Sequence, residues 1–449
     1  MNAFNLLHFA IGLFIVLYFF LFAIDSIKEN KPRALFISIA AVSTITLIWV
    51  GYSFYFGHSY LLMALPSAIV LLLAILYFSP MTKLHSELGL PTERFDERDI
   101  MFAREEYLPG TKKYEAYYNR KPELRKRDDR IRALPPLLKE GGRFYDPLRS
   151  RQIEAFFELI EGLTNKVDGP VENSHENIDP VKASQYIKDT LYSLGADEVG
   201  IAELNPKYVY SHVGRGPEKW GAPIENRHKY VIAFTLEMAY RQVEKSPLIN
   251  ITEETVRGYF NGALISTALA EAIRKIGYPA RAHIAGSNYQ IILPAVAYDA
   301  GLGELGRFGY LISRKFGARV RLGAVTTDLP LVPDKPIHFG VREFCRTCKK
   351  CADNCPSRAI PFDNPREVRG ISKWQLNVER CLTYWRLVGT DCGLCMKVCP
   401  FSHPQSRVHN IVRLGIKNSA IARKVSMWGD DIFYGRTVPK TYLNDPAED

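Results

Sequence analysis

Three long apolar runs occupy the first part of the chain. Residues 4–24, 34–56 and 60–78 contain no Asp, Glu, Lys or Arg. Each run is about as long as the ~20 helical residues that cross a hydrocarbon core. They predict three transmembrane helices and a membrane anchor over residues 1–80. No Lys or Arg precedes the first run and no small-residue cleavage site follows it, which argues against a signal peptide.

Basic residues flank these runs unevenly. Lys28, Lys31 and Arg33 lie between the first two runs, whereas the connector at 57–59 contains no Lys or Arg. The positive-inside rule therefore predicts that the first loop and everything after residue 80 face the cytoplasm. We expect a multi-pass protein of the cytoplasmic (inner) membrane, and the reducing side of that membrane suits free thiolates.

The stretch after the apolar runs is rich in charge of both signs. Residues 81–151 hold 17 Lys and Arg against 13 Asp and Glu. Basic residues concentrate at 120–132, but Glu123, Asp128 and Asp129 interrupt them and no nucleic-acid module surrounds them. We therefore expect no nucleic-acid partner and favour a solvated or membrane lipid-facing surface. The segment 81–170 is predicted to form short helices and loops that wrap a larger domain.

Helical and extended patterns alternate from about residue 180. Apolar residues at helical spacing predict a helix over Val181–Leu194 and another from about Glu254 to Ile276. Short apolar runs predict strands at Val199–Ala202 and Tyr230–Thr235. The pattern indicates an α/β or α+β domain over residues 171–335, with a sizeable core.

A glycine-rich turn follows the helical pattern of Ile291–Ala300. Gly301, Gly303 and Gly306 match G-x-G-x-x-G. A dinucleotide site also needs a strand before the motif, a helix after it and an acidic residue about 20 positions on, and residues 320–327 contain no Asp or Glu. We therefore interpret the three glycines as a turn next to a bound cofactor other than a nicotinamide nucleotide.

All eight cysteines lie between residues 345 and 399. The first run has the spacing C-x2-C-x2-C-x3-C-P of bacterial two-cluster ferredoxins, in which the fourth cysteine ligates the other cluster. The second run is C-x2-C-x3-C-P, with its remaining cysteine further upstream. The spacing predicts that one [4Fe–4S] cluster binds Cys345, Cys348, Cys351 and Cys399. The other cluster then binds Cys355, Cys381, Cys392 and Cys395.

Structural zinc is the alternative for these cysteines. Zinc sites usually pair two C-x2–4-C knuckles for each ion, whereas here two cubane clusters use every cysteine and leave none over. The pattern favours a ferredoxin-like domain with two [4Fe–4S] clusters over residues 336–412. We expect residues 413–449 to be a C-terminal extension that packs on the core.

The overall composition changes this picture little. The chain has 449 residues and a formal net charge of +10, and part of that charge lies beside the predicted anchor. Eight cysteines are too few for a disulfide scaffold of this length. The mean hydropathy of −0.11 averages an apolar anchor and a polar body.

From about Asp99 to the C-terminus the chain resembles the corrinoid-dependent reductive dehalogenases. The cysteine runs alone are not specific, because epoxyqueuosine reductases share the plan of a corrinoid and two clusters. The strings that carry the resemblance are Asp99–Arg104, Tyr114–Tyr118, Leu194–Ala202, Asp299–Arg307, Phe316–Arg321 and Asp328–Ile337.

The resemblance implies a nitroreductase-like α/β core that holds cobalamin with its lower base detached. The clusters would supply electrons for cleavage of a carbon–halogen bond in an organohalide. Tyr259 falls on the family's proton donor and Arg321 on its active-site arginine. Asn288 falls near a third polar position, which His283 or Tyr289 could occupy instead because the chain carries extra residues in this region.

Two departures from the family pattern concern the membrane. Respiratory members carry a twin-arginine export signal and bind a separate anchor protein, whereas here the anchor is fused to the enzyme. The electron donor could be a ferredoxin, a flavodoxin, a reductase or quinol. Two other functions remain open: a corrinoid reductase of the epoxyqueuosine reductase type, and a non-catalytic iron–sulfur electron-transfer subunit of a membrane complex.

Overall fold

A computed structural model shows two compact units, which are described separately. The structure describes residues 3–56, 59–80, 88–174, 176–285 and 289–439. The first unit comprises residues 1–85, 339–348 and 403–438, and the second comprises 86–338, 349–402 and 439–449. The cysteine-rich region predicted as one domain is therefore divided between the two units.

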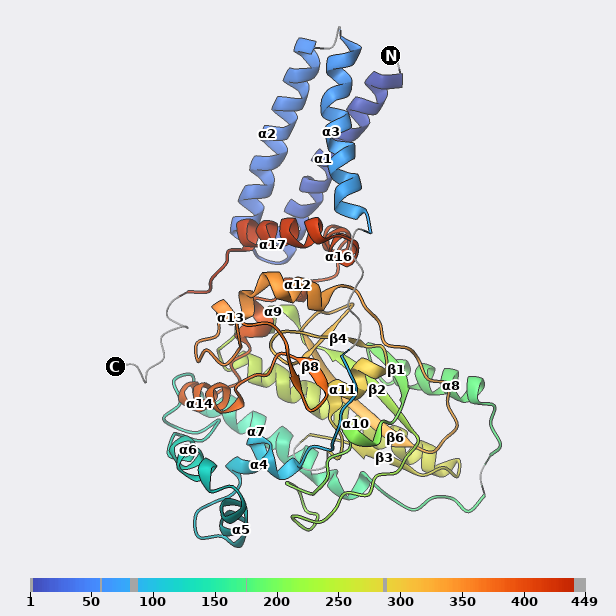
Figure 1. Ribbon diagram of the computed structural model, residues 1–449, viewed down its shortest axis with the longest axis vertical. Helices are drawn as coiled ribbons and strands as arrows, with labels where there is room; N and C mark the ends of the chain where they lie inside the picture. Colours follow the sequence, from blue (N-terminus) through green and yellow to red (C-terminus); the bar gives the residue numbers. More distant parts are fainter. Residues whose placement is uncertain (1–2, 57–58, 81–87, 175, 286–288, 440–449) are drawn as a thin grey trace. The chain divides into compact units, whose positions relative to one another are not determined.

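The apolar runs form three helices that pack side by side (Figure 1). These are α1 (Ala3–Lys28), α2 (Pro32–Phe56) and α3 (Tyr60–Phe78). Two of them, α1 from Leu6 and α2, are long and apolar enough to cross a membrane. In α3, the apolar segment Ala64–Phe78 is shorter than the 18 residues asked of a membrane span. The structure thus supports membrane anchoring through two of the three predicted spans.

Helices from the second half of the chain complete the first unit. They are α12 (Val341–Cys348), α16 (Arg407–Asn418) and α17 (Ala420–Tyr434). Phe433 of α17 packs against Phe22 of α1 with ring centres 4.7 Å apart, and the Ser426 hydroxyl lies 2.9 Å from that of Tyr77 on α3. Within the first unit, α16 and α17 thus pack against α1, α2 and α3. The expected packing of residues 413–449 on the core stays a prediction.

A four-stranded sheet forms the centre of the second unit. Its order is β1 (Glu198–Glu203), β2 (Tyr230–Glu237), β6 (Val320–Thr327) and β3 (Ala280–His283), and every neighbouring pair is antiparallel. Both predicted strands are confirmed. Because the sheet has no parallel pair, the α+β alternative describes this core.

The two faces of the sheet bury different helices because strand side chains alternate. Ile232 and Phe234 pack in a cluster with α7 (Pro147–Gly162), α8 (Pro180–Ser193) and α10 (Asn250–Lys275). Val231 and Ala233 pack instead with α11 (Leu293–Asp299). The predicted helices at 181–194 and 254–276 are confirmed, although the second begins at Asn250. This arrangement places α10 across the strands that carry the site.

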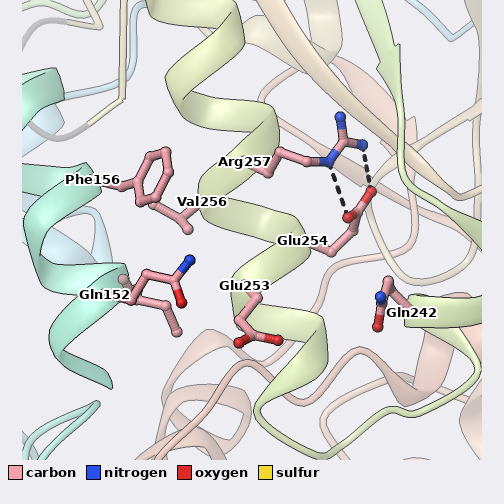
Figure 2. A pocket seen from close by; sticks show the side chains of 8 residues that line it. Gln152, Phe156, Gln242, Glu253, Glu254, Val256 and Arg257 are labelled. Carbon is pink, nitrogen blue, oxygen red and sulfur yellow. Dashed lines mark hydrogen bonds and ion pairs between the residues drawn. The ribbon is translucent and has the colours of Figure 1, made fainter. Parts of the chain in front are cut away.

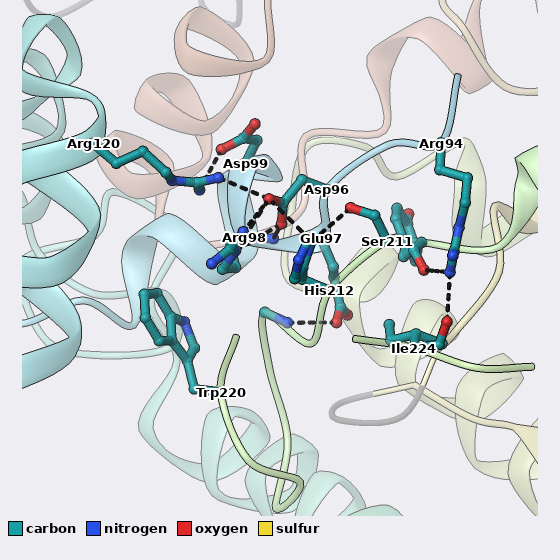
Figure 3. Close-up of polar contacts among 12 residues, drawn as sticks. Arg94, Asp96, Glu97, Arg98, Asp99, Arg120, Ser211, His212, Trp220 and Ile224 are labelled. Atoms are coloured by element: carbon teal, nitrogen blue, oxygen red, sulfur yellow. Dashed lines mark hydrogen bonds and ion pairs between the residues drawn. The ribbon is translucent and has the colours of Figure 1, made fainter. Parts of the chain in front are cut away.

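Short helices make up most of the wrapping segment, as predicted. They are the 3-10 helices η1 (Glu97–Asp99) and η2 (Thr164–Lys166) and the helices α4 (Met101–Glu105), α5 (Lys112–Arg120), α6 (Pro122–Arg132) and α7. Figure 3 shows that Arg120 contacts Asp96 at 2.8 Å and Asp99 at 3.0 Å. Arg132 likewise pairs with Asp129 at 2.5 Å. The basic residues of 120–132 are thus partly neutralised within the segment itself, and a solvated or lipid-facing surface there stays a prediction.

The remaining elements of the second unit are short. They comprise η3 (Pro206–Tyr208), α9 (Tyr240–Val243), the hairpin β4 (Gly303–Leu305) and β5 (Leu311–Ser313), α13 (Lys350–Asp353), the hairpin β7 (Arg366–Val368) and β8 (Ile371–Lys373), α14 (Val378–Val388), α15 (Leu394–Lys397) and η4 (Pro400–Ser402).

Candidate functional site

Arg321 and Tyr259 meet between the sheet and α10. Val325 of β6 packs against α10, and Arg321 lies on the same face of that strand, since strand side chains repeat every second residue. The guanidinium carbon of Arg321 lies 5.1 Å from the centre of the Tyr259 ring. The two predicted catalytic residues are therefore brought together by the packing of one strand on one helix.

A glycine makes this approach possible. A Cβ atom at position 258 would lie 2.7 Å from Cγ of Arg321 and 3.1 Å from its Cβ. Any larger residue at 258 would force the Arg321 side chain away from α10, or α10 away from the sheet. In the sequence, the one sign of a role for Gly258 is its position directly before Tyr259.

Two further polar side chains hold the guanidinium. Arg321 donates a hydrogen bond from Nη2 to the Thr255 hydroxyl, and the same nitrogen lies 3.6 Å from Oδ2 of Asp391. The backbone N–H of Asp391 donates to Thr252 Oγ1 at 2.9 Å, which ties the carboxylate to α10. Neither Thr255 nor Asp391 was predicted from the sequence, because neither lies in a motif that indicates a catalytic or binding role.

Burial sets the protonation balance of this group. Burial opposes the charge on Arg321, but Tyr259 and Asp391 outweigh it, so the pKa of the guanidinium lies above its ordinary value. Burial likewise raises the pKa of the Asp391 carboxyl, although Arg321 and Thr255 counter this. The result is a fixed cation beside the Tyr259 ring.

Of the three candidates for the third polar position, Tyr289 interacts with this pair. Asn288 lies outside the described residues. His283 is buried on β3, and its Nε2 lies 3.0 Å from Thr326 Oγ1. Burial raises the pKa of Tyr289, and the charges of Tyr259 and Arg321 both act on it. This favours the alternative Tyr289 over His283.

The glycine-rich turn leads into the β4–β5 hairpin. A Cβ atom at Gly301, whose φ is +74°, would lie 2.5 Å from the Lys335 carbonyl oxygen, and one at Gly303 would lie 2.2 Å from the Ile312 carbonyl oxygen. At Gly306 it would lie 2.7 Å from Ile312 Cδ1. Helix α11 precedes the turn and strand β4 follows it, the reverse of the order in a dinucleotide fold. Close packing thus accounts for the glycines, and their contact with a cofactor stays a prediction.

Four of the cysteines influence one another electrostatically. They are Cys355, Cys381, Cys392 and Cys395. Burial first, and then the neighbouring thiols, raise the pKa of Cys381 and of Cys392, and the pKa of Cys395 rises to about 12. Buried thiols that disfavour one another's ionisation need a cation to become thiolates, so this donor set fits an iron–sulfur cluster.

Local backbone geometry supports this set. Gly393, between Cys392 and Cys395, has φ of +64°, and a Cβ atom there would lie 2.6 Å from Ile251 Cγ1. The backbone N–H of Ala359 donates to the Cys355 sulfur at 3.2 Å. Amide hydrogen bonds to ligating sulfurs are among the features that tune such clusters. The other four cysteines, Cys345, Cys348, Cys351 and Cys399, are all buried.

Tyr310 links the tyrosine–arginine pair to this cysteine set. The charges of Tyr259 and Arg321 act on it, and so do those of Cys381 and Cys395. Its side chain is nevertheless 46% exposed. The buried Nε of Arg321 has no hydrogen-bond partner among the described residues. An open aromatic face and an orphaned cationic nitrogen near both groups fit a bound redox cofactor at this place.

A separate pocket opens beside α10 and does not include this pair. Figure 2 shows Phe156 and Gln152 on one wall and the ion pair of Arg257 with Glu254 on the other, with Nε to Oε2 at 3.0 Å. Its volume of about 220 Å³ is below the range of about 300–1,000 Å³ typical of ligand sites. We assign it no ligand.

Comparison with known proteins identifies the cysteine-rich region. Residues 344–403 match the model of the 4Fe-4S dicluster domain. The iron–sulfur prediction is therefore confirmed at the level of the domain.

The predicted resemblance is also confirmed. The chain is 34% identical over 297 residues to a tetrachloroethene reductive dehalogenase of Desulfitobacterium hafniense, covering 55% of this chain and 53% of that protein. It is 34% identical over 291 residues to that of Sulfurospirillum multivorans, covering 57% of each. The chain thus spans about half the length of the curated relatives it matches.

A solved structure agrees over a larger part of this chain. It is described as suggesting a mechanism for B12-dependent dehalogenation by a reductive dehalogenase, and it superposes with a TM-score of 0.66 at 26% identity. The match covers 81% of this chain and 49% of the other. The catabolic reductive dehalogenase NpRdhA in complex with 3-bromo-4-hydroxybenzoic acid gives a TM-score of 0.63 at 26% identity, covering 82% of this chain and 50% of the other.

Proposed function

We propose that this chain, homologous to reductive dehalogenases over more than half of its length, is a membrane-anchored enzyme that removes halogen reductively from an organohalide. One observation carries the proposal: Arg321 contacts both Tyr259, 5.1 Å from its ring centre, and Asp391, 3.6 Å away, which directly precedes the candidate cluster ligand Cys392. The candidate proton donor and one candidate cluster ligand are thus joined through a single arginine and its carboxylate partner. The reaction is R–X plus two electrons and one proton, giving R–H and halide.

The cofactors follow from the donor sets. Two [4Fe–4S] clusters would use the cysteine sets predicted above. Cobalamin, when bound, supplies low-potential cobalt chemistry that cleaves the carbon–halogen bond with electrons relayed by the clusters. Gly301, Gly303 and Gly306 are the candidate positions on this chain that would contact it. We retain the nitroreductase-like description for residues 171–335 as part of this proposal.

Tyr259 is the group that delivers the proton. An ordinary tyrosine has a pKa of about 10 and gives up its proton reluctantly at neutral pH. The guanidinium of Arg321, held by Thr255 and Asp391, places a positive charge beside the ring that becomes anionic on proton transfer. Tyr289, the alternative to Asn288, would be the third polar group facing the substrate.

The membrane arrangement rests on the charge pattern and the apolar helices. We propose that α3 is a third span and that the second unit faces the cytoplasm, where a ferredoxin, flavodoxin, reductase or quinol would reduce it. Alkaline phosphatase fused after residue 59 should then be active, and the same reporter fused after residue 80 inactive. The opposite result would contradict the orientation.

The decisive test of activity uses the full chain in detergent, loaded with cobalamin and clusters. Reduced viologen supplies electrons, and halide release is measured with tetrachloroethene, a bromohydroxybenzoate and other haloalkanes and haloaromatics. Release from at least one substrate is expected. Absence of bound corrinoid, or no release by fully loaded protein, would overturn the proposal.

Two other functions have distinct outcomes. The chain is 30% identical over 149 residues to an epoxyqueuosine reductase of Lactococcus garvieae, covering 30% of this chain and 38% of that protein. Turnover of epoxyqueuosine-containing tRNA would favour that reaction. Iron and sulfide without cobalt would favour a non-catalytic electron-transfer subunit.

A further inference from the structure

Two histidines and one glutamate converge inside the first unit, far from one another in sequence. Glu29 lies in the connection between α1 and α2, His403 precedes α16, and His409 lies on α16. Their ligand atoms all lie within 4.8 Å of one another. His409 Nε2 is 2.7 Å from Glu29 Oε1, and His403 Nδ1 is 3.6 Å from Glu29 Oε2. Two imidazoles and a carboxylate thus face a common centre.

Two of these atoms are buried without a hydrogen-bond partner. Glu29 is only 6% exposed, yet its Oε2 has no partner among the described residues, and neither has Nδ1 of His403. Buried polar atoms are normally satisfied, so each unpaired atom calls for an explanation. An oxygen and a ring nitrogen 3.6 Å apart, both unpaired, suit the edge of a coordination polyhedron with metal–ligand distances of about 2.0–2.2 Å.

The surroundings orient one imidazole in the way that metal ligands require. Nε2 of His403 lies 2.8 Å from Oδ1 of Asp430, on α17. A metal-bound histidine almost always donates its other ring N–H to such a carboxylate, which leaves the first nitrogen free to bind the ion. The His403 and His409 rings stack with an interplanar angle of 8° and centres 4.8 Å apart. Their positions are therefore fixed by packing.

The charge of the surroundings also favours a cation. Two buried carboxylates flank His403: Glu29 Oε2 lies 3.6 Å from its Nδ1 and Asp430 Oδ1 lies 2.8 Å from its Nε2. Buried charges in proteins are normally paired or coordinate a metal ion, so two carboxylates beside two imidazoles suit a divalent cation.

We propose that Glu29, His403 and His409 bind one divalent transition-metal ion of the zinc class, leaving a fourth position for water. Two imidazoles and one carboxylate with an open position are a known zinc ligand set. The ion would clamp the connection between α1 and α2 to α16, and through Asp430 to α17. This site is separate from the eight cysteines and independent of the proposed dehalogenation.

Zinc content and coordination test the site without any assay of activity. The full chain is purified anaerobically with its clusters, given one equivalent of Zn²⁺ in the presence of a weak chelator, and analysed for zinc and iron. We expect about one zinc per chain. Zinc X-ray absorption should show only nitrogen and oxygen ligands near 2.0–2.1 Å, including imidazole. Zinc–sulfur distances near 2.3 Å would place the ion on cysteines and overturn the proposal.

Matched variants separate the site from general effects on folding. Glu29→Gln and His409→Gln should lose the zinc, and Asp430→Asn should weaken its binding about 10–100-fold. Asp25→Asn, one helical turn before Glu29, is the control and should bind zinc like wild type. Iron content should be the same in all four variants. Zinc-free wild-type protein, or wild-type zinc content in Glu29→Gln, would show a purely hydrogen-bonded cluster instead.

Discussion

The guanidinium of Arg321 lies against the face of the Tyr259 ring, 5.1 Å from its centre, and is held there by Thr255 and Asp391. This relationship joins the two residues that the family resemblance singled out. It also explains why Gly258 precedes the tyrosine, since a side chain there would displace the arginine.

Removing the phenol oxygen should remove turnover while leaving the cofactors in place. Tyr259→Phe is expected to lower halide release about 100-fold or more, the usual contribution of a positioned acid. Cluster spectra and corrinoid content should match wild type. Tyr192→Phe, at an exposed tyrosine of α8, is the control. Wild-type turnover in Tyr259→Phe would rule out this residue as the proton donor.

Adding a side chain at position 258 should lower turnover by displacing the Arg321 guanidinium. Gly258→Ala introduces a Cβ atom 2.7 Å from Arg321 Cγ, so we expect turnover to fall by up to about 100-fold through misplacement of the guanidinium. Gly262→Ala on the same helix is the matched control, because its Cβ would lie 3.6 Å from Leu236, an ordinary contact. That control should keep full activity and gain up to about 1 kcal/mol of stability from its helix propensity. Equal activity in both variants would contradict the proposed contact.

Spectra of cysteine variants can show which cysteines of the two runs bind the same cluster. If Cys355 shares a cluster with Cys381, then Cys355→Ser and Cys381→Ser should alter the same electron paramagnetic resonance signal of the reduced protein. Cys351→Ser, although close to Cys355 in sequence, should alter the other signal. The assignment fails if Cys351→Ser and Cys355→Ser change one and the same cluster.

Asp299 should make stability depend on pH. Burial raises the pKa of its carboxyl from 3.8 to about 6. Between these values the folded chain holds a proton that the unfolded chain has released, so this residue lowers the free energy of unfolding as pH rises through about 6, and the loss is complete above that pH. Asp299→Asn removes the effect. The Tm of the variant minus that of wild type should therefore increase from pH 5 to pH 7 and then level off, whereas a constant difference would contradict the assignment.

Much of the chemistry could be read from local spacing. Three cysteines in a short loop can bind one cluster whatever the rest of the fold. The spacing of the cysteines at 345–399 was therefore enough to identify the iron–sulfur domain. Runs of about 20 apolar residues predicted the N-terminal apolar helices for the same reason, because length and polarity are properties of a segment alone. Tyr259 and Arg321 were found through the family strings around them.

Long-range packing decided the rest. Asp391 reaches Arg321 only because its loop lies beside α10, and Tyr310 reaches both halves of the site only because the β4–β5 hairpin folds toward them. The two candidate ligands Glu29 and His409 are 380 positions apart in sequence, and neither lies in a recognisable motif. The sequence by itself determined which cofactors and helices to expect. Only the tertiary structure determined which distant side chains meet, because such contacts depend on how helices and strands pack rather than on any periodicity along the chain.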